Sequence, residues 1–261
     1  MERKDPDLHP QTLRLNRFLA LAGIGSRRKN DELILSGVVR LNGAVVTDLG
    51  VKVDTSRDRV SVNGNPVALS QKKVYILLNK PKDCITTAKD ERGRTTVMDY
   101  VRPGERVFPV GRLDRNTTGV LLLTNDGDLA HALMHPSFEI ERVYHVGLDE
   151  PVSEAEAQKI RRGVRLEDGF ARASSLSIVP GSRRQELLLT LGEGRNREVR
   201  RMMEALGKKV KKLDRVSYAG LSTQGVSRGR WRYLHPKEID ALKRRVEETP
   251  RKRGQHTSDD Q

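Results

Sequence analysis

The stretch that most constrains this chain is the loop Gly111–Gly119, which leads directly into the apolar run Val120-Leu121-Leu122-Leu123. A continuous apolar run of this length is typical of a strand buried on both faces. The loop carries Asp114 between Arg112 and Arg115. Because the buried strand fixes the end of the loop, we expect Asp114 to be held in place and kept ionised by the two arginines. A fixed, ionised, partly desolvated carboxylate suits nucleophilic catalysis, and we predict that Asp114 is the nucleophile.

The composition points to a polyanionic partner. The 261 residues include 49 Lys+Arg against 35 Asp+Glu, a formal net charge of +14, and are enough for one large or two modest domains. Aromatic residues make up only 4% of the chain, which argues against a ring-lined platform that stacks many bases. Dispersed arginines that recognise phosphate and shape are the better expectation, and the surplus extends into the second half of the chain.

Cysteine usage and hydropathy limit the alternatives. The single cysteine, Cys84, excludes an intramolecular disulfide and a multi-cysteine zinc site, and we expect it to be a small apolar filler. No apolar run approaches the ~18 residues of a membrane span, and the N-terminus lacks the apolar core of a signal peptide. We therefore expect a soluble, cytoplasmic protein without membrane attachment.

The first part of the chain predicts a small helical unit with short strands over residues 13–70. A loose N-terminus is expected over residues 1–12, a helix over 13–22, and a second helix from an N-cap at Ser26 to Leu35. Asn42-Gly43 suits the two-residue turn of a hairpin, and a further strand is expected over 59–62. The two helices carry basic side chains that could form one phosphate-binding face or simply a solvated surface: Arg14, Arg17, Arg27, Arg28 and Lys29.

This region resembles the S4 RNA-binding domain. The matching stretches are residues 14–20, 25–28 and 37–43. The sequence departs from the family pattern at Asn30, where an alanine is usual; we expect this to affect only the surface chemistry of the helix. The resemblance implies that residues 13–70 grip an RNA hairpin.

After a connector over residues 71–73, the pattern predicts a mixed α/β domain with a mainly antiparallel sheet over residues 74–246, so the whole chain is assigned to the α+β class. The expected strands are 74–78, 120–123, 142–146, 164–166, 171–178, 186–191, 210–213 and 217–221. Helices are expected over 128–134, 153–162, 196–206 and 236–246. From residue 247 onward the composition is that of a disordered tail.

The second domain strongly resembles the pseudouridine synthases. The central motif is Gly111-Arg112-Leu113-Asp114 with Thr117, Gly119 and the run 121–127. Pro109-Val110 and His135-Pro136 are typical of the ribosomal RNA branch, and the string from Glu193 to Met202 is closest to the type that acts on the large subunit. With Asn79-Lys80-Pro81 and Arg142-Val143-Tyr144, these matches extend the resemblance over residues 13 to about 245.

The resemblance implies roles for individual residues. Asp114 matches the catalytic aspartate, Tyr144 the tyrosine that packs on the target uracil, and Arg200 the basic residue that pairs with the aspartate. Arg112 matches the arginine that fills the space left by the extruded base. The alternatives without a catalytic role are a core tyrosine at 144, a surface arginine at 200, and a simple charge partner of Asp114 at 112. Further RNA contacts are expected from Lys80, Arg115, Arg195, Arg197 and Arg201. Two departures are Asp83, where a glycine is frequent, and Arg142, which replaces a common lysine.

The implied reaction needs no metal or nucleotide cofactor. Pseudouridine formation is an isomerisation in which the bond from N1 to the ribose breaks and C5 bonds to the ribose instead. The chain contains no dinucleotide-binding or P-loop motif, and its six histidines lack ligand spacing. Asp114 could attack the ribose or the uracil ring, or assist removal of a sugar proton. The uridine must be flipped out of stacked RNA at a cost of a few kcal/mol.

The expected partner is therefore a stem-loop of ribosomal RNA, in the large subunit (23S) or its assembly intermediate, bound by a monomer. The alternatives are the same chemistry on small-subunit (16S) RNA, or a non-catalytic RNA-binding or ribosome-assembly factor that retains the fold.

Overall fold

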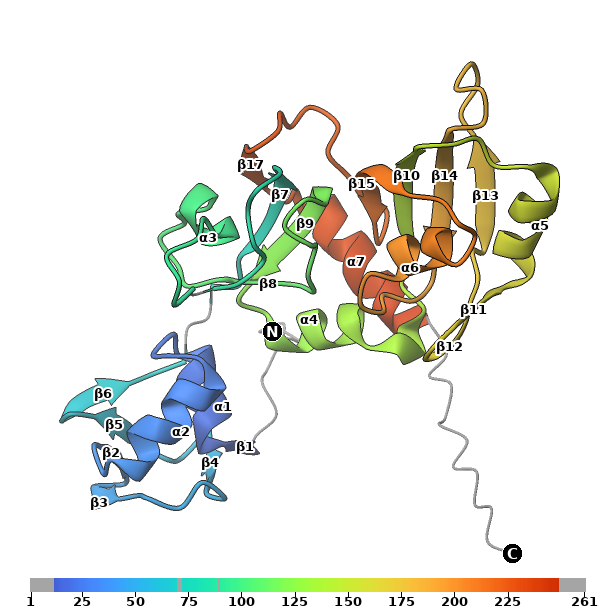
Figure 1. The fold of residues 1–261 in the computed structure, drawn as a ribbon. Helices are drawn as coiled ribbons and strands as arrows, with labels where there is room; N and C mark the ends of the chain where they lie inside the picture. The colour runs from blue at the N-terminus through green and yellow to red at the C-terminus, as the bar shows by residue number, and fades with distance from the viewer. Residues whose placement is uncertain (1–11, 70–71, 89, 249–261) are drawn as a thin grey trace, which may run out of the picture. The chain divides into compact units, whose positions relative to one another are not determined.

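The computed structural model describes residues 12–69, 72–88 and 90–248. The chain divides into two compact units, Met1–Lys73 and Val74–Gln261 (Figure 1). Nearly all of the expected loose N-terminus (1–12) and of the expected tail (247–261) lies outside the described residues. The predicted α+β class with a mainly antiparallel sheet is confirmed.

The N-terminal unit packs two helices on short strands around one apolar core. Its helices are α1 (Leu15–Leu21) and α2 (Arg27–Leu35). Strand β1 (Thr12–Arg14) pairs with β4 (Lys52–Asp54), and a four-stranded sheet has the order β3 (Ala44–Val45), β2 (Val39–Leu41), β5 (Val60–Val62), β6 (Asn65–Val67). The core comprises Leu13, Leu15, Phe18, Leu19, Ile34, Val39, Val53 and Val60.

Local signals predicted much of this unit correctly. The Ser26 side chain caps α2 by accepting a hydrogen bond from the Lys29 amide at 3.2 Å, as expected for an N-cap. Asn42 and Gly43 have φ values of +51° and +86°, which the predicted hairpin turn requires.

Two expectations for the N-terminal unit were wrong. Residues 12–14 form a strand rather than the start of a helix, because Leu13 pairs with Val53 of β4 and is buried. Asn30 does not affect surface chemistry, since it is fully buried and its Nδ2 donates to the carbonyl oxygens of Asn16 (3.2 Å) and Gly25 (3.4 Å). Asn30 therefore joins the two helices from inside.

The C-terminal unit is built on one nine-stranded sheet. The strand order is β13 (Ser175–Ile178), β14 (Glu186–Leu191), β10 (Arg142–Leu148), β15 (Val210–Tyr218), β9 (Thr118–Thr124), β7 (Tyr75–Lys80) and β17 (Trp231–Tyr233), while β16 (Leu221–Ser222) pairs with β15 and β8 (Phe108–Pro109) with β9. All these pairs are antiparallel except β15–β9. A separate hairpin joins β11 (Val164–Leu166) and β12 (Gly169–Ala171).

Helices cover both faces of this sheet (Figure 1). They are α3 (Val97–Tyr100), α4 (Gly127–Met134), the 3-10 helix η1 (Pro136–Phe138), α5 (Glu154–Arg162), α6 (Glu198–Glu204) and α7 (Pro236–Glu248). The apolar run of β9 is fully buried and alternates between two cores: Val120 and Leu122 pack with residues of α4 and α7, whereas Leu121 and Leu123 pack with Val97 of α3. The prediction that this strand is buried on both faces is confirmed. Within the described residues, none of the helices combines the length and the apolar character needed to span a membrane.

Strand β15 was predicted as two separate strands, and this was wrong. Asp214 and Arg215 interrupt its apolar pattern, but both side chains form hydrogen bonds inside the fold. Asp214 accepts hydrogen bonds from Thr118 Oγ1 (2.6 Å) and from Arg228 (3.0 and 3.1 Å), while Arg215 Nε donates to the Val120 carbonyl (2.9 Å). The continuous strand brings Arg215 next to both Tyr144 of β10 and Gly119 of β9.

Candidate active site

A buried lysine holds the loop that carries Asp114. Lys80 ends β7, is fully buried, and donates from Nζ to the carbonyl oxygens of Pro81 (3.1 Å), Asp114 (3.1 Å), Arg115 (3.2 Å) and Thr117 (2.9 Å). The prediction that Lys80 contacts RNA was wrong, because a side chain with no exposed surface cannot reach a phosphate. Burial lowers the pKa of Lys80 to about 8.

Gly119 allows the loop to meet β15 closely. Its φ is +107°, and a Cβ built at this position would lie 2.2 Å from the Arg215 carbonyl oxygen. Only glycine fits this contact without a shift of the backbone. The end of the loop is thereby pressed against the strand that carries Arg215.

The Asp114 carboxylate faces arginines from a distant part of the sequence. Its Oδ2 lies 3.9 Å from Arg197 Nη1 and 3.9 Å from Arg200 Nε, and 35% of the side-chain surface is exposed. Burial is the main reason that the pKa of Arg200 is lowered, and Arg200 Nη1 also donates to the Val210 carbonyl at 3.1 Å. The structure therefore brings Arg200 and Asp114 together, as the resemblance implied.

The expectation that Arg112 and Arg115 hold Asp114 ionised was wrong. In the part of the chain that the structure describes, the ion pairs of Asp114 are with Arg197 and Arg200. Arg115 instead pairs with Asp83 at 3.1 Å. Asp83 adopts φ +57°, a conformation that glycine favours but aspartate tolerates. Arg112 is exposed and lines the same cavity as Asp114.

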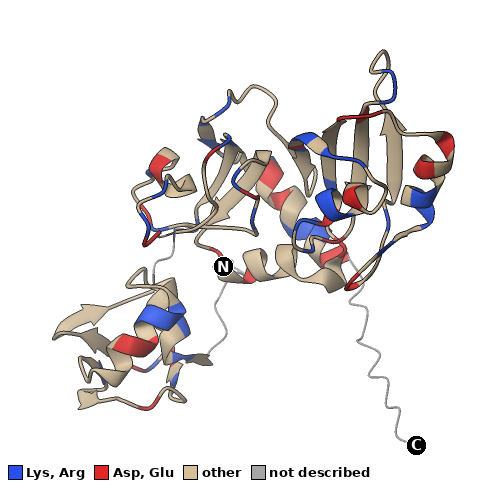
Figure 2. Ribbon diagram, in the orientation of Figure 1, with Lys and Arg blue, Asp and Glu red and all other residues tan. Residues whose placement is uncertain are grey.

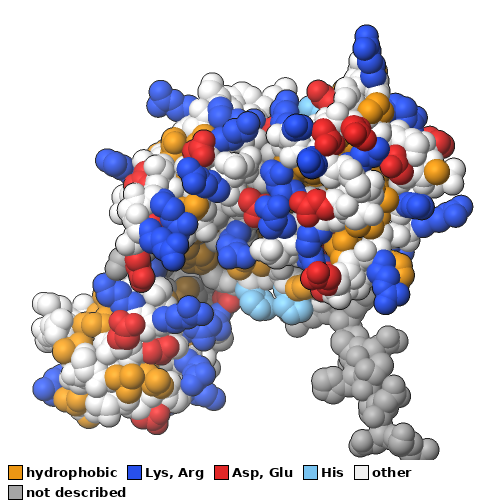
Figure 3. Space-filling view, viewed as in Figure 1, with side chains coloured by type: hydrophobic (Ala, Val, Ile, Leu, Met, Phe, Trp, Pro, Cys, Tyr) orange, Lys and Arg blue, Asp and Glu red, His pale blue; other side chains and the backbone are white. Residues whose placement is uncertain are grey.

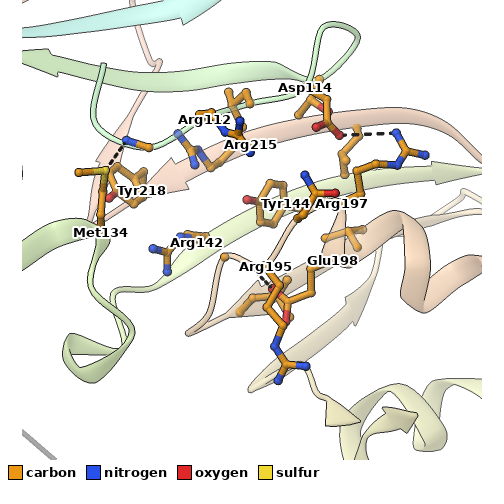
Figure 4. A pocket seen from close by; sticks show the side chains of 18 of the residues that line it. Arg112, Asp114, Met134, Arg142, Tyr144, Arg195, Arg197, Glu198, Arg215 and Tyr218 are labelled. Atoms are coloured by element: carbon orange, nitrogen blue, oxygen red, sulfur yellow. Dashed lines mark hydrogen bonds and ion pairs between the residues drawn. The ribbon is translucent and has the colours of Figure 1, made fainter. Parts of the chain in front are cut away.

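Asp114 opens onto a cavity of about 420 Å³. Figure 4 shows Asp114 and Arg197 at one end, Tyr218 and Met134 at the other, and Tyr144 between them. The cavity also admits arginine side chains from several elements, namely Arg112, Arg142, Arg195 and Arg215. This volume is in the range of small-ligand sites, ~300–1,000 Å³, and the excess of arginine suits an anionic ligand.

Two arginines and a tyrosine form part of the cavity wall. The guanidinium carbons of Arg142 and Arg215 lie 5.5 and 4.6 Å from the centre of the Tyr218 ring, and the Tyr218 hydroxyl donates to the Leu133 carbonyl at 2.9 Å. Arg215 is only 3% exposed, and its Nη2 has no hydrogen-bond partner among the residues that the structure describes. The sequence reasoning did not select Arg215. An arginine inside an otherwise apolar strand pattern was the available signal, and it was read as a break between strands.

Glu198 is a second residue that the sequence reasoning missed. It begins α6, is buried at the cavity, and accepts a hydrogen bond from the Arg195 amide at 3.2 Å. Burial raises the pKa of its carboxyl group. A carboxyl group in this setting can hold a proton at higher pH than a surface glutamate does.

Three arginines on or just before α6 were predicted to contact RNA, and their surroundings divide them into two groups. Arg197 is half-exposed and pairs with Asp114 and Glu204. Arg195 and Arg201 are bound to protein groups: Arg201 pairs with both carboxylate oxygens of Asp168 (2.9 and 3.0 Å), and Arg195 contacts Asp168 and Glu193. Within the described residues there is no cluster of three or more side chains that could ligate a metal ion.

Comparison with known proteins decides the family. The sequence profile described as "RNA pseudouridylate synthase" matches residues 74–205, and that of the S4 domain matches residues 13–60. The chain belongs to the RNA pseudouridine synthase family. These matches confirm both resemblances drawn from the sequence, to the pseudouridine synthases and to the S4 domain.

Relatives of this pseudouridine synthase match it over most of its length. It is 45% identical over 234 residues to "Ribosomal large subunit pseudouridine synthase B" of Bacillus subtilis, covering 88% of this chain and 95% of that protein. It is 42% identical to an uncharacterised RNA pseudouridine synthase of Aquifex aeolicus, covering 92% and 98%. A solved structure described as "Crystal structure of pseudouridylate synthase" is 29% identical with a TM-score of 0.65, covering 88% of this chain and 99% of that one.

The S4 domain of this pseudouridine synthase carries its predicted basic residues on α1, on α2 and at the end of β1. Arg14, Arg27, Arg28 and Lys29 are exposed, and Arg17 is partly exposed. Figure 2 shows basic residues on the helices of this unit. Their exposure leaves these side chains accessible to phosphate.

Proposed function

We propose that this pseudouridine synthase isomerises a specific uridine of large-subunit ribosomal RNA and that Asp114 is its nucleophile. The observation that supports the proposal most directly is the position of Asp114, on an immobilised loop, at the end of a cavity, facing Arg197 and Arg200. The name of the Bacillus subtilis relative supports the large subunit as the target.

The proposed reaction breaks the bond from N1 to C1′ of the ribose, turns the ring, and forms a bond from C5 to C1′ with loss of the C5 proton. The carboxylate of Asp114 attacks C1′ or the uracil ring, or removes a sugar proton; each role needs the ionised form. At 3.9 Å, Arg197 and Arg200 favour the charge without occupying the carboxylate in short hydrogen bonds. Tyr144 lines the cavity, and we propose that its ring packs against the uracil.

The target uridine has to leave the RNA stack before it can enter the cavity. Arg112 lies on the same loop as Asp114, two residues before it, and is exposed. We propose that its guanidinium occupies the space that the base leaves, which offsets part of the cost of a few kcal/mol for flipping. The exposed basic residues of the S4 domain are proposed to bind phosphates of a stem-loop and so to position the target.

A small-subunit target and a non-catalytic RNA-binding factor are the two alternatives, and they predict different pseudouridine patterns in cells. Pseudouridines in ribosomal RNA are mapped in a strain that lacks the protein and in the same strain with the wild type, Asp114→Asn or Asp83→Asn restored. We expect one large-subunit pseudouridine to disappear on deletion and to return with the wild type and with Asp83→Asn, but not with Asp114→Asn. Asp83 is a matched control because it lies near Arg115 in the same region, and asparagine tolerates its left-handed backbone.

Loss of a small-subunit pseudouridine instead would overturn the large-subunit target. An unchanged pseudouridine pattern would support a non-catalytic RNA-binding or assembly factor. Full restoration by Asp114→Asn would overturn the role of Asp114.

A further inference from the structure

The β11–β12 hairpin presents an exposed aromatic ring between two arginines. Phe170 is 64% exposed, and its cross-strand neighbour is Arg165, so the two side chains share one face of the hairpin. Arg172 follows the end of β12, and exposure still alternates there: Ala171 and Ala173 are buried whereas Phe170 and Arg172 are exposed, which places Arg172 on the same side as Phe170. Arg165 and Arg172 are both exposed. Figure 3 shows hydrophobic and basic side chains next to one another over this hairpin.

The Phe170 ring is supported on one side. Gly163 has φ +125°, and a Cβ built there would lie 3.6 Å from Phe170 Cδ1 and 3.7 Å from its Cβ. The ring therefore lies against a position without a side chain, and this contact limits its freedom. Since most of the ring surface remains exposed, a second planar group can stack on it.

The hairpin is bound to α6 and to the residues just before it, the segment whose Arg197 and Arg200 face Asp114. Arg195 donates from Nη1 to the Asp168 carbonyl (3.3 Å) and from Nη2 to the Phe170 carbonyl (2.8 Å). Arg201 of α6 forms a two-pronged ion pair with Asp168. The same helix carries Arg200, which pairs with Asp114, and Arg195 lines the cavity. Phe170 is thus held at a fixed position relative to the catalytic cavity.

The charge around Phe170 favours a nucleic acid over a protein. Asp168 is neutralised by Arg195 and Arg201, whereas Arg165 and Arg172 have no acidic partner within ion-pair distance among the residues that the structure describes. An aromatic ring with free guanidinium groups beside it suits a base flanked by phosphates. An apolar protein partner would gain little from two desolvated arginines.

We propose that Arg165, Phe170 and Arg172 form a binding site for an unpaired nucleotide that flanks the target uridine. The base stacks on Phe170, and the two arginines bind its neighbouring phosphates. This inference rests on the proposed function for the identity of the RNA, and it adds a contact that fixes which uridine reaches Asp114.

The test measures binding and chemistry separately. The probe is an unmodified transcript of the host's 23S ribosomal RNA, and the full-length protein is compared with Phe170→Ala, Phe170→Trp and the matched control Tyr233→Ala. Tyr233 is an exposed aromatic residue (51%) on the edge strand β17 and outside the hairpin. We expect Phe170→Ala to weaken RNA binding about 5- to 150-fold, which is the range for loss of one base–aromatic stack. Phe170→Trp and Tyr233→Ala should bind like the wild type, and Tyr233→Ala should also keep the wild-type single-turnover rate at saturating RNA.

A double variant, Arg165→Ala with Arg172→Ala, should lower the slope of log affinity against log salt by about 2. Wild-type affinity of Phe170→Ala for the transcript would overturn the proposal and leave the hairpin as a protein-docking surface. Failure of Phe170→Trp to restore binding would also contradict stacking. If the wild type formed no pseudouridine but Phe170→Ala still weakened binding, the proposed function would fail and the nucleotide site would stand.

Discussion

Deprotonation of Lys80 should raise the free energy of unfolding of this protein while it lowers the activity. The folded-state pKa is about 8, below the ordinary value of 10.5, so between these pH values the folded state binds fewer protons than the unfolded state. The free energy of unfolding therefore rises with pH in this window. The difference between these two pKa values corresponds to a gain of at most about 3 kcal/mol.

Activity should change in the opposite direction over the same window. The ammonium group of Lys80 has three protons for the four surrounding carbonyl oxygens, of which three belong to Asp114, Arg115 and Thr117. The neutral amine keeps two protons and directs a lone pair at the same cage. The loop then loses part of its support, and Asp114 is held less firmly.

The assay is single-turnover pseudouridine formation from about pH 7 to pH 10, with urea unfolding at each pH. The wild-type rate should fall above pH 8, by about tenfold per unit if only the ammonium form is active. The Lys80→Met variant keeps a long apolar side chain without the proton, so its lower rate should show no such step. If both proteins lost activity at the same pH, or if wild-type stability fell together with its rate, the reasoning about Lys80 would be refuted.

Three further predictions concern the walls of the site and the S4 domain. Gly119→Ala should destabilise the protein by about 2–4 kcal/mol in urea unfolding, because its Cβ would lie 2.2 Å from the Arg215 carbonyl oxygen. Gly104→Ala should not, because no described residue has an atom within 4 Å of a Cβ at that position; equal midpoints would contradict this. Arg215→Met should lower the single-turnover rate about 10²–10³-fold with little loss of stability, since it removes a buried cation that has no carboxylate partner within the described part of the chain; unchanged turnover would exclude an electrostatic role. Arg27→Ala with Arg28→Ala should lower the slope of log RNA affinity against log salt by about 2. Arg40→Ala is the control, because the Arg40 Nη1 already donates to the Gly43 carbonyl. An unchanged slope would show that the α2 arginines do not bind RNA.

Features encoded by neighbouring residues could be predicted from the sequence. Ser26 caps its helix where it was expected to, and Asn42-Gly43 forms the expected turn, because each depends on a few adjacent residues. The burial of the run Val120–Leu123 followed from its apolar pattern alone. The proximity of Arg200 to Asp114 came from the family resemblance rather than from any local signal.

What could not be predicted depends on strands that are distant in sequence. The cage around Lys80 exists because β7 and β9 pair, and the partners of Asp114 come from the start of α6, more than 80 residues later. The residues next to Lys80 or Asp114 in the sequence indicate neither the β7–β9 pairing nor the ion pairs with the start of α6. Arg215 was missed for a similar reason, because its buried place in β15 depends on pairing with both β9 and β10.

The most direct test of the central claim measures release of the C5 hydrogen by Asp114 variants. Formation of the bond from C5 to C1′ displaces the hydrogen at C5, so RNA labelled with tritium at that position releases tritium to water as pseudouridine forms. With unmodified large-subunit RNA, wild type and Asp83→Asn should release one tritium per molecule of RNA. Asp114→Asn should bind the RNA as tightly as the wild type and release tritium at least about 10³-fold more slowly. Release by Asp114→Asn at the wild-type rate would contradict the account.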